Sequence, residues 1–250
     1  MTIRKISATP STNSQLKSLL KAEKLPDGFV LLTEEQTAGR GQMGSVWQSQ
    51  KGKSLTFSVF KQLDGFEVEH QFYLSKVVSL AVFETLNYFQ IPEIKIKWPN
   101  DILSANKKLC GILIENIIQQ QSIKGCIIGV GINVNEQTFT ELPLATSMKL
   151  QAERIFDLEE VLNRLLQILN SKWHLISEKQ FSEIDKAYFD LLYRLNEISV
   201  FENAQQEKFN GKIQGVSREG KLLVELETGE ISAFDLKEIK LLSGLQSGHI

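Results

Sequence analysis

The chain has 250 residues, a hydrophobic fraction of 42%, a charged fraction of 23% and a formal net charge of −2. These values are typical of a globular protein with a sizeable core and argue against a disordered chain. The near-neutral charge argues against a general nucleic-acid or acidic-membrane binder. No signal peptide is expected, because a polar stretch follows Arg4 and Lys5. The apolar runs are too short to span a membrane, so we expect a soluble, cytoplasmic protein with no membrane partner.

The two cysteines, Cys110 and Cys126, both lie in apolar runs that have strand character. Their spacing is neither that of a CxxC pair nor that of a zinc finger. We therefore expect two reduced thiols in the core of a cytosolic protein.

Residues 1–60 predict three strands, one helix and a glycine-rich loop. Ser11, Thr12 and Asn13 are residue types that favour the start of a helix. Apolar residues alternate with polar ones from Ser54 to Phe60, which is typical of a half-buried strand. In chain order we expect a strand over 3–8, a helix through 16–20, a strand over 29–32, the loop over 33–52 and a strand over 54–60.

Residues 74–195 predict three helices and three further strands. Apolar residues recur at helical spacing over 74–89, which indicates an amphipathic helix. Asp157 and Glu160 form a capping box at the start of another helix. The remaining expected elements are strands over 94–98, 108–118 and 123–134, with a hairpin turn at 119–122, and helices over 158–173 and about 181–195.

The sequence pattern changes after Asn196, where short predicted strands alternate with glycine-containing turns. Such close spacing predicts a small β-barrel of SH3-like size. We therefore place a domain boundary near Leu195 and expect an α+β protein with domains at 1–195 and 196–250.

Three tempting signals carry no function. Gly52 to Ser54 resembles the end of a phosphate-binding P-loop, but the first glycine of that motif would fall on Trp47. The stretch from Gly129 to Val134 begins like a dinucleotide fingerprint but ends on valine. Surface or helix-packing roles are expected for the histidines rather than a triad or a metal set: these are His70, His174 and His249.

The most informative segment runs from Gln36 to Trp47 and contains Gly39, Gly41 and Gly44. Glycines let the backbone approach a ligand closely, and successive amides in such a loop can bind an anion. Arg40 adds a planar cation that suits carboxylate or phosphate. The alternative interpretation is a surface loop with one solvated arginine.

Three later segments add polar groups to strands. Residues 95–101 end in Pro-Asn-Asp, which a simple turn would also explain. Residues 107–115 place a lysine directly before a buried strand. Residues 129–135 combine two glycines with two asparagines.

The order of these segments resembles that of the biotin–protein ligases. The family pattern is Ser-Thr-Asn, Gly-Arg-Gly-x-x-Gly-x-x-Trp, Lys-Trp-Pro-Asn-Asp, Lys-Leu-x-Gly-Ile-Leu and Gly-x-Gly-Ile-Asn-Val-Asn. This chain meets it at 11–13, 39–47, 97–101, 108–113 and 129–135. The resemblance covers about residues 5–135 by motif. It implies a catalytic domain like those of class II aminoacyl-tRNA synthetases, with a mixed sheet flanked by helices, followed by an SH3-like barrel.

The resemblance also implies site residues. The biotin-binding positions would be Ser11, Thr12, Asn13, Gln36, Arg40, Gly41, Gln42 and Lys108. The positions that bind ATP or the adenylate would be Gly39, Gly44, Trp47, Lys97, Asn100 and Asn133. Arg40, Lys108 and Asp101 would be catalytic. Mg²⁺ would arrive with ATP, with Asp101 as its candidate protein ligand and no dedicated protein cage.

The implied reaction joins biotin to a lysine of a biotin carboxyl carrier protein through biotinyl-5′-AMP, with ATP and Mg²⁺. Such a protein is expected to be a monomer or a homodimer. Many members carry a second arginine after Gly-Arg-Gly, whereas this chain has Gln42. Glutamine supplies no charge, so we expect Gln42 to affect how tightly the adenylate is retained.

Three alternatives to this function follow from the sequence. Lipoate ligases and transferases share this kind of fold, but the Gly-Arg-Gly and Lys-Trp-Pro-Asn-Asp motifs favour biotin. A DNA-binding repressor is not expected, because only ten residues precede Ser11. A non-catalytic binding module is disfavoured, since both Arg40 and Lys108 are present.

Overall fold

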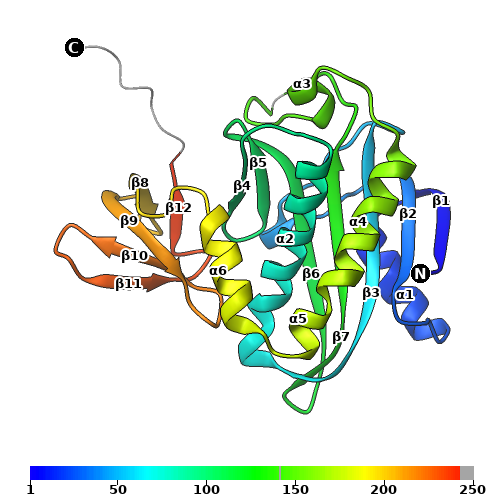
Figure 1. The fold of residues 1–250 in the computed structure, drawn as a ribbon, viewed down its shortest axis with the longest axis horizontal. Coiled ribbons are helices and arrows are strands. Elements are labelled where there is room, and N and C mark those ends of the chain that lie inside the picture. Colours follow the sequence, from blue (N-terminus) through cyan, green and yellow to red (C-terminus); the bar gives the residue numbers. More distant parts are fainter. Residues whose placement is uncertain (141, 243–250) are drawn as a thin grey trace.

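The computed structural model describes residues 1–140 and 142–242, which form two β-sheets with helices packed against them (Figure 1). The larger sheet has seven strands in the order β1-β2-β3-β7-β6-β5-β4. Its strands are β1 (Ile3–Thr9), β2 (Phe29–Gln36), β3 (Ser54–Glu67), β4 (Ile94–Lys97), β5 (Asp101–Ser104), β6 (Lys107–Gln119) and β7 (Ser122–Asn133). β1 and β2 are parallel and the other pairs are antiparallel, so the expected mixed sheet is confirmed.

Strand β5 and the length of β2 differ from the sequence prediction. β5 pairs with β4 and β6 and was not among the predicted strands; Asn100 lies in the turn before it, and Asp101 is its first residue. β2 continues to Gln36, so the glycine-rich loop is shorter than the predicted 33–52. β5 has only four residues, too few to show a clear alternation.

The helices lie mainly on one face of the larger sheet, with α1 on the other (Figure 1). Their bounds are α1 (Thr12–Ala22), η1 (Gln42–Gly44), η2 (Val68–His70), α2 (Gln71–Tyr88), α3 (Met148–Ala152), α4 (Leu158–Lys172), α5 (His174–Ser177) and α6 (Phe181–Leu191). Asp157 caps α4 as predicted, because its Oδ1 accepts hydrogen bonds from the amides of Glu159 and Glu160 at 2.7 and 3.1 Å. The short α3 was not predicted.

Helix α6 ends at Leu191, four residues before the expected 195. The chain turns there because Leu192 forms a bridge with Ile96 of β4, and the amide of Tyr193 donates to the Ile96 carbonyl at 2.8 Å. Pairing with the sheet edge thus replaces the last helical turn.

Helix α2 is central to the core and is buried on most of its surface. Leu74, Val77 and Leu86 have no exposed surface, and truncating such a side chain to alanine typically costs about 2–5 kcal/mol. Lys76 of α2 is also buried, with its ammonium 2.5 Å from the Asp185 carboxylate of α6. Burial lowers the pKa of Lys76, and Asp185 opposes that shift.

Both cysteines are buried and free, as predicted. Burial raises the pKa of the Cys126 thiol to about 12, and it raises the pKa of Cys110 further. Neither thiol is therefore a nucleophile at neutral pH.

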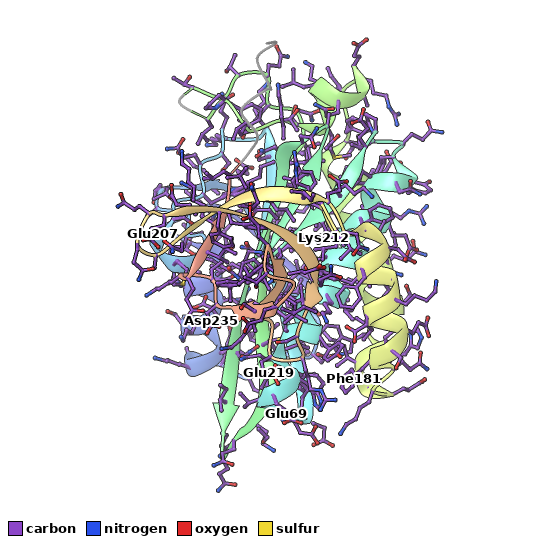
Figure 2. The ribbon with its side chains drawn as sticks, turned by 90° about the vertical axis from the view of Figure 1, so that its left-hand side faces the viewer. Glu69, Phe181, Glu207, Lys212, Glu219 and Asp235 are labelled. Carbon is purple, nitrogen blue, oxygen red and sulfur yellow. The ribbon has the colours of Figure 1, made fainter. Side chains whose placement is uncertain are left out.

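The second sheet has five antiparallel strands in the order β11-β10-β9-β8-β12, consistent with the expected SH3-like domain. They are β8 (Ile198–Asn203), β9 (Lys208–Val216), β10 (Leu222–Leu226), β11 (Ile231–Phe234) and β12 (Ile239–Leu241). Figure 2 shows this sheet toward the viewer, with Lys212 on β9, Glu207 in the connection before β9 and Asp235 in the connection after β11.

The two sheets belong to one hydrophobic core, which includes Phe201, Ile213 and Val224 of the second sheet. Trp98 Nε1, between β4 and β5, donates to the Gly220 carbonyl at 2.9 Å. A Cβ at Gly220, whose φ is +99°, would lie 2.7 Å from Phe72 of α2. The second sheet is therefore packed tightly against α2 and the connection between β4 and β5.

Candidate active site

A cavity of about 490 Å³ lies between the start of α1, the glycine-rich loop and the centre of β6 and β7. All eight residues that the sequence predicts for biotin binding line it: Ser11, Thr12, Asn13, Gln36, Arg40, Gly41, Gln42 and Lys108. The structure thus brings together residues from three separate segments of the chain.

A second cavity of about 370 Å³ adjoins the first. Val46, Trp47, Asp101 and Lys108 line both cavities and so form the wall between them. Of the residues predicted for the nucleotide, Trp47, Lys97 and Asn133 line the second cavity, and Asn100 lines the first. Gly39 and Gly44 line neither and instead border a shallow groove along the loop.

The start of α1 is held in the first cavity by a buried polar network. Gln36 Oε1 accepts hydrogen bonds from the Thr12 amide at 2.8 Å and from its hydroxyl at 3.2 Å. The Ser58 hydroxyl of β3 lies 2.7 Å from the Thr12 hydroxyl and 2.6 Å from Asn13 Oδ1. The network offers neutral donors and acceptors whose orientations are set by neighbouring elements.

Glu115 of β6 joins the loop to the start of α1. Its Oε1 is 3.0 Å from Arg40, and its Oε2 accepts a hydrogen bond from Asn13 Nδ2 at 2.8 Å. Arg40 also donates to the Ser14 hydroxyl at 3.0 Å. One carboxylate therefore fixes both the loop cation and an amide of the cavity wall.

Lys108 and Asp101 form an ion pair of 2.7 Å on the wall between the cavities. Lys97 lines the second cavity, and its burial lowers its pKa. The Asp101 carboxylate opposes that shift, and the charges of Lys108 and Lys240 add to it. Several cations thus gather around one carboxylate, which favours an anionic ligand.

The glycine-rich loop is closed into a hairpin by backbone bonds. The Gly41 amide donates to the Ser45 carbonyl at 2.7 Å, and the Trp47 amide donates to the Gly39 carbonyl at 2.9 Å. A Cβ at Gly39 would lie 2.3 Å from the Trp47 carbonyl, so only glycine permits this approach. The loop therefore presents Arg40 and Gln42 to the cavity in a fixed register.

The small residues of β6 and β7 make room for other groups. Gly111 and Gly131 pair across these strands. A Cβ would lie 3.1 Å from the Trp47 ring at Gly111 and 2.4 Å at Gly131. At Gly129, on the same face of β7, it would lie 2.4 Å from Asn13 Oδ1. The small-residue gap seen in the sequence is thus the floor of the site.

Four contributors were not found from the sequence. Ser58 belongs to the polar residues that alternate with apolar ones from Ser54 to Phe60, and Glu115 follows an apolar run. Neither pattern identifies the partner of the polar side chain. Leu236 and Lys237 come from the connection between β11 and β12 and also line the first cavity. Nothing in the local sequence links that connection to the site.

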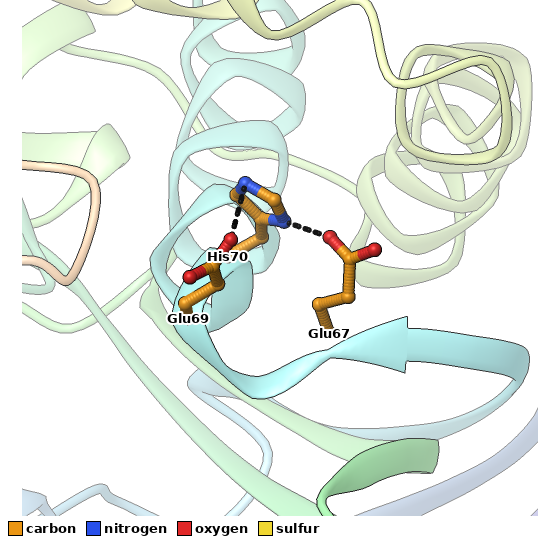
Figure 3. Close-up of side chains that lie close together, drawn as sticks. All are labelled: Glu67, Glu69 and His70. Carbon is orange, nitrogen blue, oxygen red and sulfur yellow. Dashed lines mark ion pairs between the residues drawn. The ribbon is translucent and has the colours of Figure 1, made fainter.

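A separate polar cluster lies at η2, where His70 stands between Glu67 and Glu69 (Figure 3). Glu67 is 2.7 Å from Nδ1, and Glu69 is 3.5 Å from Nε2. The two carboxylates thus contact different ring nitrogens, and one donor atom from each of the three residues lies within 4.8 Å of the others. The His70 ring packs against Phe181 with centroids 4.5 Å apart, which agrees with the expected helix-packing role.

Comparison with known proteins identifies the family. Residues 6–133 match the biotin/lipoate A/B protein ligase family. The chain is 30% identical to the bifunctional ligase/repressor BirA of Bacillus spizizenii over 233 residues, which cover 90% of this chain and 68% of the relative. It is 28% identical to a biotin–[acetyl-CoA-carboxylase] ligase of Paracoccus denitrificans, over 90% of this chain and 94% of that protein.

Among solved structures, a biotin protein ligase from Aquifex aeolicus in complex with biotin and ATP is similar, with a TM-score of 0.80 and 28% identity. The match covers 97% of this chain and 99% of that one. The chain therefore belongs to the biotin/lipoate A/B protein ligase family. None of the helices in the described part of the chain is both long and apolar enough to cross a membrane.

Proposed function

We propose that the protein attaches biotin to a lysine of a carrier protein, using ATP and a biotinyl-5′-AMP intermediate. The observation that supports this most strongly is the pair of adjoining cavities, with Lys108 and Asp101 on their shared wall. A reaction between two small molecules needs both to meet at one point, and the shared wall is such a point.

Biotin would occupy the first cavity. The neutral groups of Thr12, Asn13 and Gln36 suit a ureido ring, which offers both donors and acceptors. The biotin carboxylate would then lie toward the cations Arg40 and Lys108, which line the same cavity. Gln42 and Ser11 add to the polar lining.

ATP would occupy the second cavity, with Trp47 on its wall and Lys97 beside the phosphates. Asn100, Gly39 and Gly44, also predicted for the nucleotide, do not line this cavity: Asn100 lines the first one, and the two glycines border the groove along the loop. Mg²⁺ fits here, because Asn133 Oδ1 is buried without a hydrogen-bond partner in the described structure, and Asp101 adds carboxylate oxygens. When bound, Mg²⁺ would neutralise phosphate charge.

In the first step a biotin carboxylate oxygen attacks the α-phosphorus of ATP, and pyrophosphate leaves. Two anions must approach each other, so Arg40 and Lys108 would lower the barrier by stabilising the charge that develops. In the second step the lysine amine of the carrier attacks the acyl carbon, and AMP leaves. Asp101 would orient the amine or accept its proton. A closed loop would keep water from the anhydride.

The partner would be a biotin carboxyl carrier protein or domain. We propose domains at 1–195 and 196–250, the first holding most of the site and the second contributing the β11–β12 connection. A monomer and a homodimer are both compatible with this arrangement.

The alternative substrate is lipoate, because the matched family includes lipoate ligases. Purified protein should be given labelled biotin or labelled lipoate with ATP, and pyrophosphate release and label transfer to a carrier should be measured. Exchange that depends on biotin supports the proposal. Exchange that depends on lipoate instead, or on neither acid, would overturn it.

A further inference from the structure

The first cavity has three cations on its lining, and two of them are already paired. Arg40 lies 3.0 Å from Glu115, and Lys108 lies 2.7 Å from Asp101. Lys237 lines the same cavity and forms no ion pair within residues 1–140 and 142–242. Lys237 is therefore the cation whose charge is not offset by a contacting carboxylate in that part of the chain.

Lys237 reaches the cavity from the second sheet, in the connection between β11 and β12. This connection is held by an ion pair of 3.1 Å between Lys221 and Asp235. The Asp235 amide also donates to the Glu238 carboxylate at 2.7 Å. Leu236 lines both the cavity and the groove along the glycine-rich loop. The backbone that carries Lys237 thus has a defined place beside the loop.

The glycine-rich loop carries a neutral side chain, Gln42, where it lines the same cavity. Gln42 lines the cavity, and its Oε1 is buried with no hydrogen-bond partner in the described structure. A buried polar atom without a partner is costly unless a ligand or water satisfies it. Gln42 can supply a hydrogen bond to a ligand there but no charge.

We propose that Lys237 binds the negatively charged phosphate of the acyl-adenylate, so that the second sheet supplies the cation that the loop lacks at Gln42. This inference rests on the proposed function and adds a residue to its site. A hydrogen bond from a charged donor is stronger than one from a neutral amide. Lys237 is exposed, so its contribution depends on salt.

The test compares three variants of the full-length protein: Lys237→Ala, Lys237→Arg and the control Lys208→Ala. Lys208 is an exposed lysine of β9 in the same sheet and lines neither cavity. The dissociation rate of preformed biotinyl-adenylate is measured at low and high salt. Lys237→Ala should release it about tenfold faster at low salt, the effect of one charged contact. The dissociation rates of Lys237→Arg and Lys208→Ala should stay within about twofold of the wild-type rate, since both variants keep the charge at position 237.

Salt dependence and rescue separate this role from a structural one. The release rate of wild type should rise with salt more steeply than that of Lys237→Ala. Salt screens the contact between Lys237 and the phosphate, and the variant lacks this contact. Adding Gln42→Arg to Lys237→Ala should restore slow release, since both side chains line one cavity. A merely structural defect would not be repaired by a charge on the loop.

The outcomes also separate this inference from the proposed function. If wild-type protein shows no biotin-dependent pyrophosphate exchange, the proposed function fails. If wild type exchanges but Lys237→Ala and Lys208→Ala release the adenylate at equal rates, Lys237 has no role in binding. Failure of Gln42→Arg to rescue would likewise overturn the inference that the two positions act on one charge.

Discussion

The ammonium of Lys108 lies 2.7 Å from the Asp101 carboxylate, on the wall that the two cavities share. Backbone bonds hold Lys108 in place, because its amide donates to the Leu144 carbonyl at 2.7 Å and its carbonyl accepts from the Thr146 amide at 2.9 Å. An arriving carboxylate or phosphate would compete with Asp101 for this lysine. Binding of the anion would then release Asp101 for the incoming amine.

The first prediction concerns Lys108→Ala. The side chain is partly exposed and its ion pair adds little to stability, about 0–1 kcal/mol. We therefore expect a nearly unchanged thermal unfolding temperature but a loss of adenylate formation on the order of 10²- to 10³-fold. Pyrophosphate exchange and thermal unfolding are measured side by side. Lys107→Ala, the exposed neighbour, is the control and should keep full exchange. A folded Lys108→Ala protein with normal exchange would contradict the role.

The second prediction concerns Glu115→Gln, which keeps the shape and removes the charge. Arg40 loses its ion-pair partner, and Asn13 loses a charged acceptor. We expect biotin affinity to fall by about tenfold, the effect of weakening one or two charge-assisted hydrogen bonds. Titration of biotin by calorimetry measures this directly. The control Glu34→Gln changes an exposed glutamate outside the cavity. Equal biotin affinities of Glu115→Gln and Glu34→Gln would show that Glu115 does not position Arg40 or Asn13 for binding.

The sequence predicted the central parts of the site because its motifs are local. Gly129 and Gly131 share a face of β7 through the two-residue period of a strand, so their spacing already marks a floor. The contact between Glu115 and Asn13 joins residues 102 positions apart. Such a contact depends on the register of several strands, which spacing alone does not set.

The same reasoning explains the other misses. Lys237 reaches the cavity only because the second sheet packs against the first unit, and its own segment looks like an ordinary exposed turn. The end of α6 was misplaced because pairing of Leu192 with Ile96 overrides the helical pattern. Helical periodicity, by contrast, located α2 and α4 well, since each has apolar residues at helical spacing over several turns.

The third prediction concerns the slot for Trp47. Gly131→Ala should displace the indole, because the added Cβ would lie 2.4 Å from the ring. We expect a higher KM for ATP and a smaller change in biotin affinity, as for Trp47→Ala, since Trp47 is proposed for the nucleotide side. The double variant should be no worse than Trp47→Ala alone, because the clash has gone. Steady-state kinetics with varied ATP measure these effects. An additive loss in the double variant would contradict the slot.

The fourth prediction concerns pH and the buried thiols. The folded-state pKa of Cys126 is raised to about 12, above the ordinary value for an unfolded chain of about 8.5. The unfolded state therefore loses its proton first as pH rises. Stability from this group is fully present below about pH 8.5 and declines between that value and about 12.

Two measurements check this alkaline loss. The midpoint of denaturant unfolding should fall between pH 8 and pH 11, and Cys126→Ala should reduce that fall. At pH 8 both thiols should resist iodoacetamide in the native protein and react once it is unfolded. Rapid alkylation of the native protein would show that the thiols are accessible.

The last prediction concerns truncation after Leu195. The second sheet shares its core with the first unit through side chains such as Ile213 and Val224. Removing residues 196–250 would expose the surface of α6 that meets Gly215 and would break the bond from Trp98 to Gly220. We expect a clear drop in the thermal unfolding temperature, because buried apolar area becomes exposed.

The truncated protein would also lose Leu236 and Lys237 from the first cavity and Leu241 and Leu242 from the second. Biotin binding should be partly kept, since Ser11 to Asn13 and Gln36 remain, while adenylate formation and transfer should fall further. Thermal unfolding, biotin titration and transfer to a carrier are measured on the same preparation. A truncated protein that unfolds at the wild-type temperature and transfers biotin at the wild-type rate would show that the second sheet is dispensable for both.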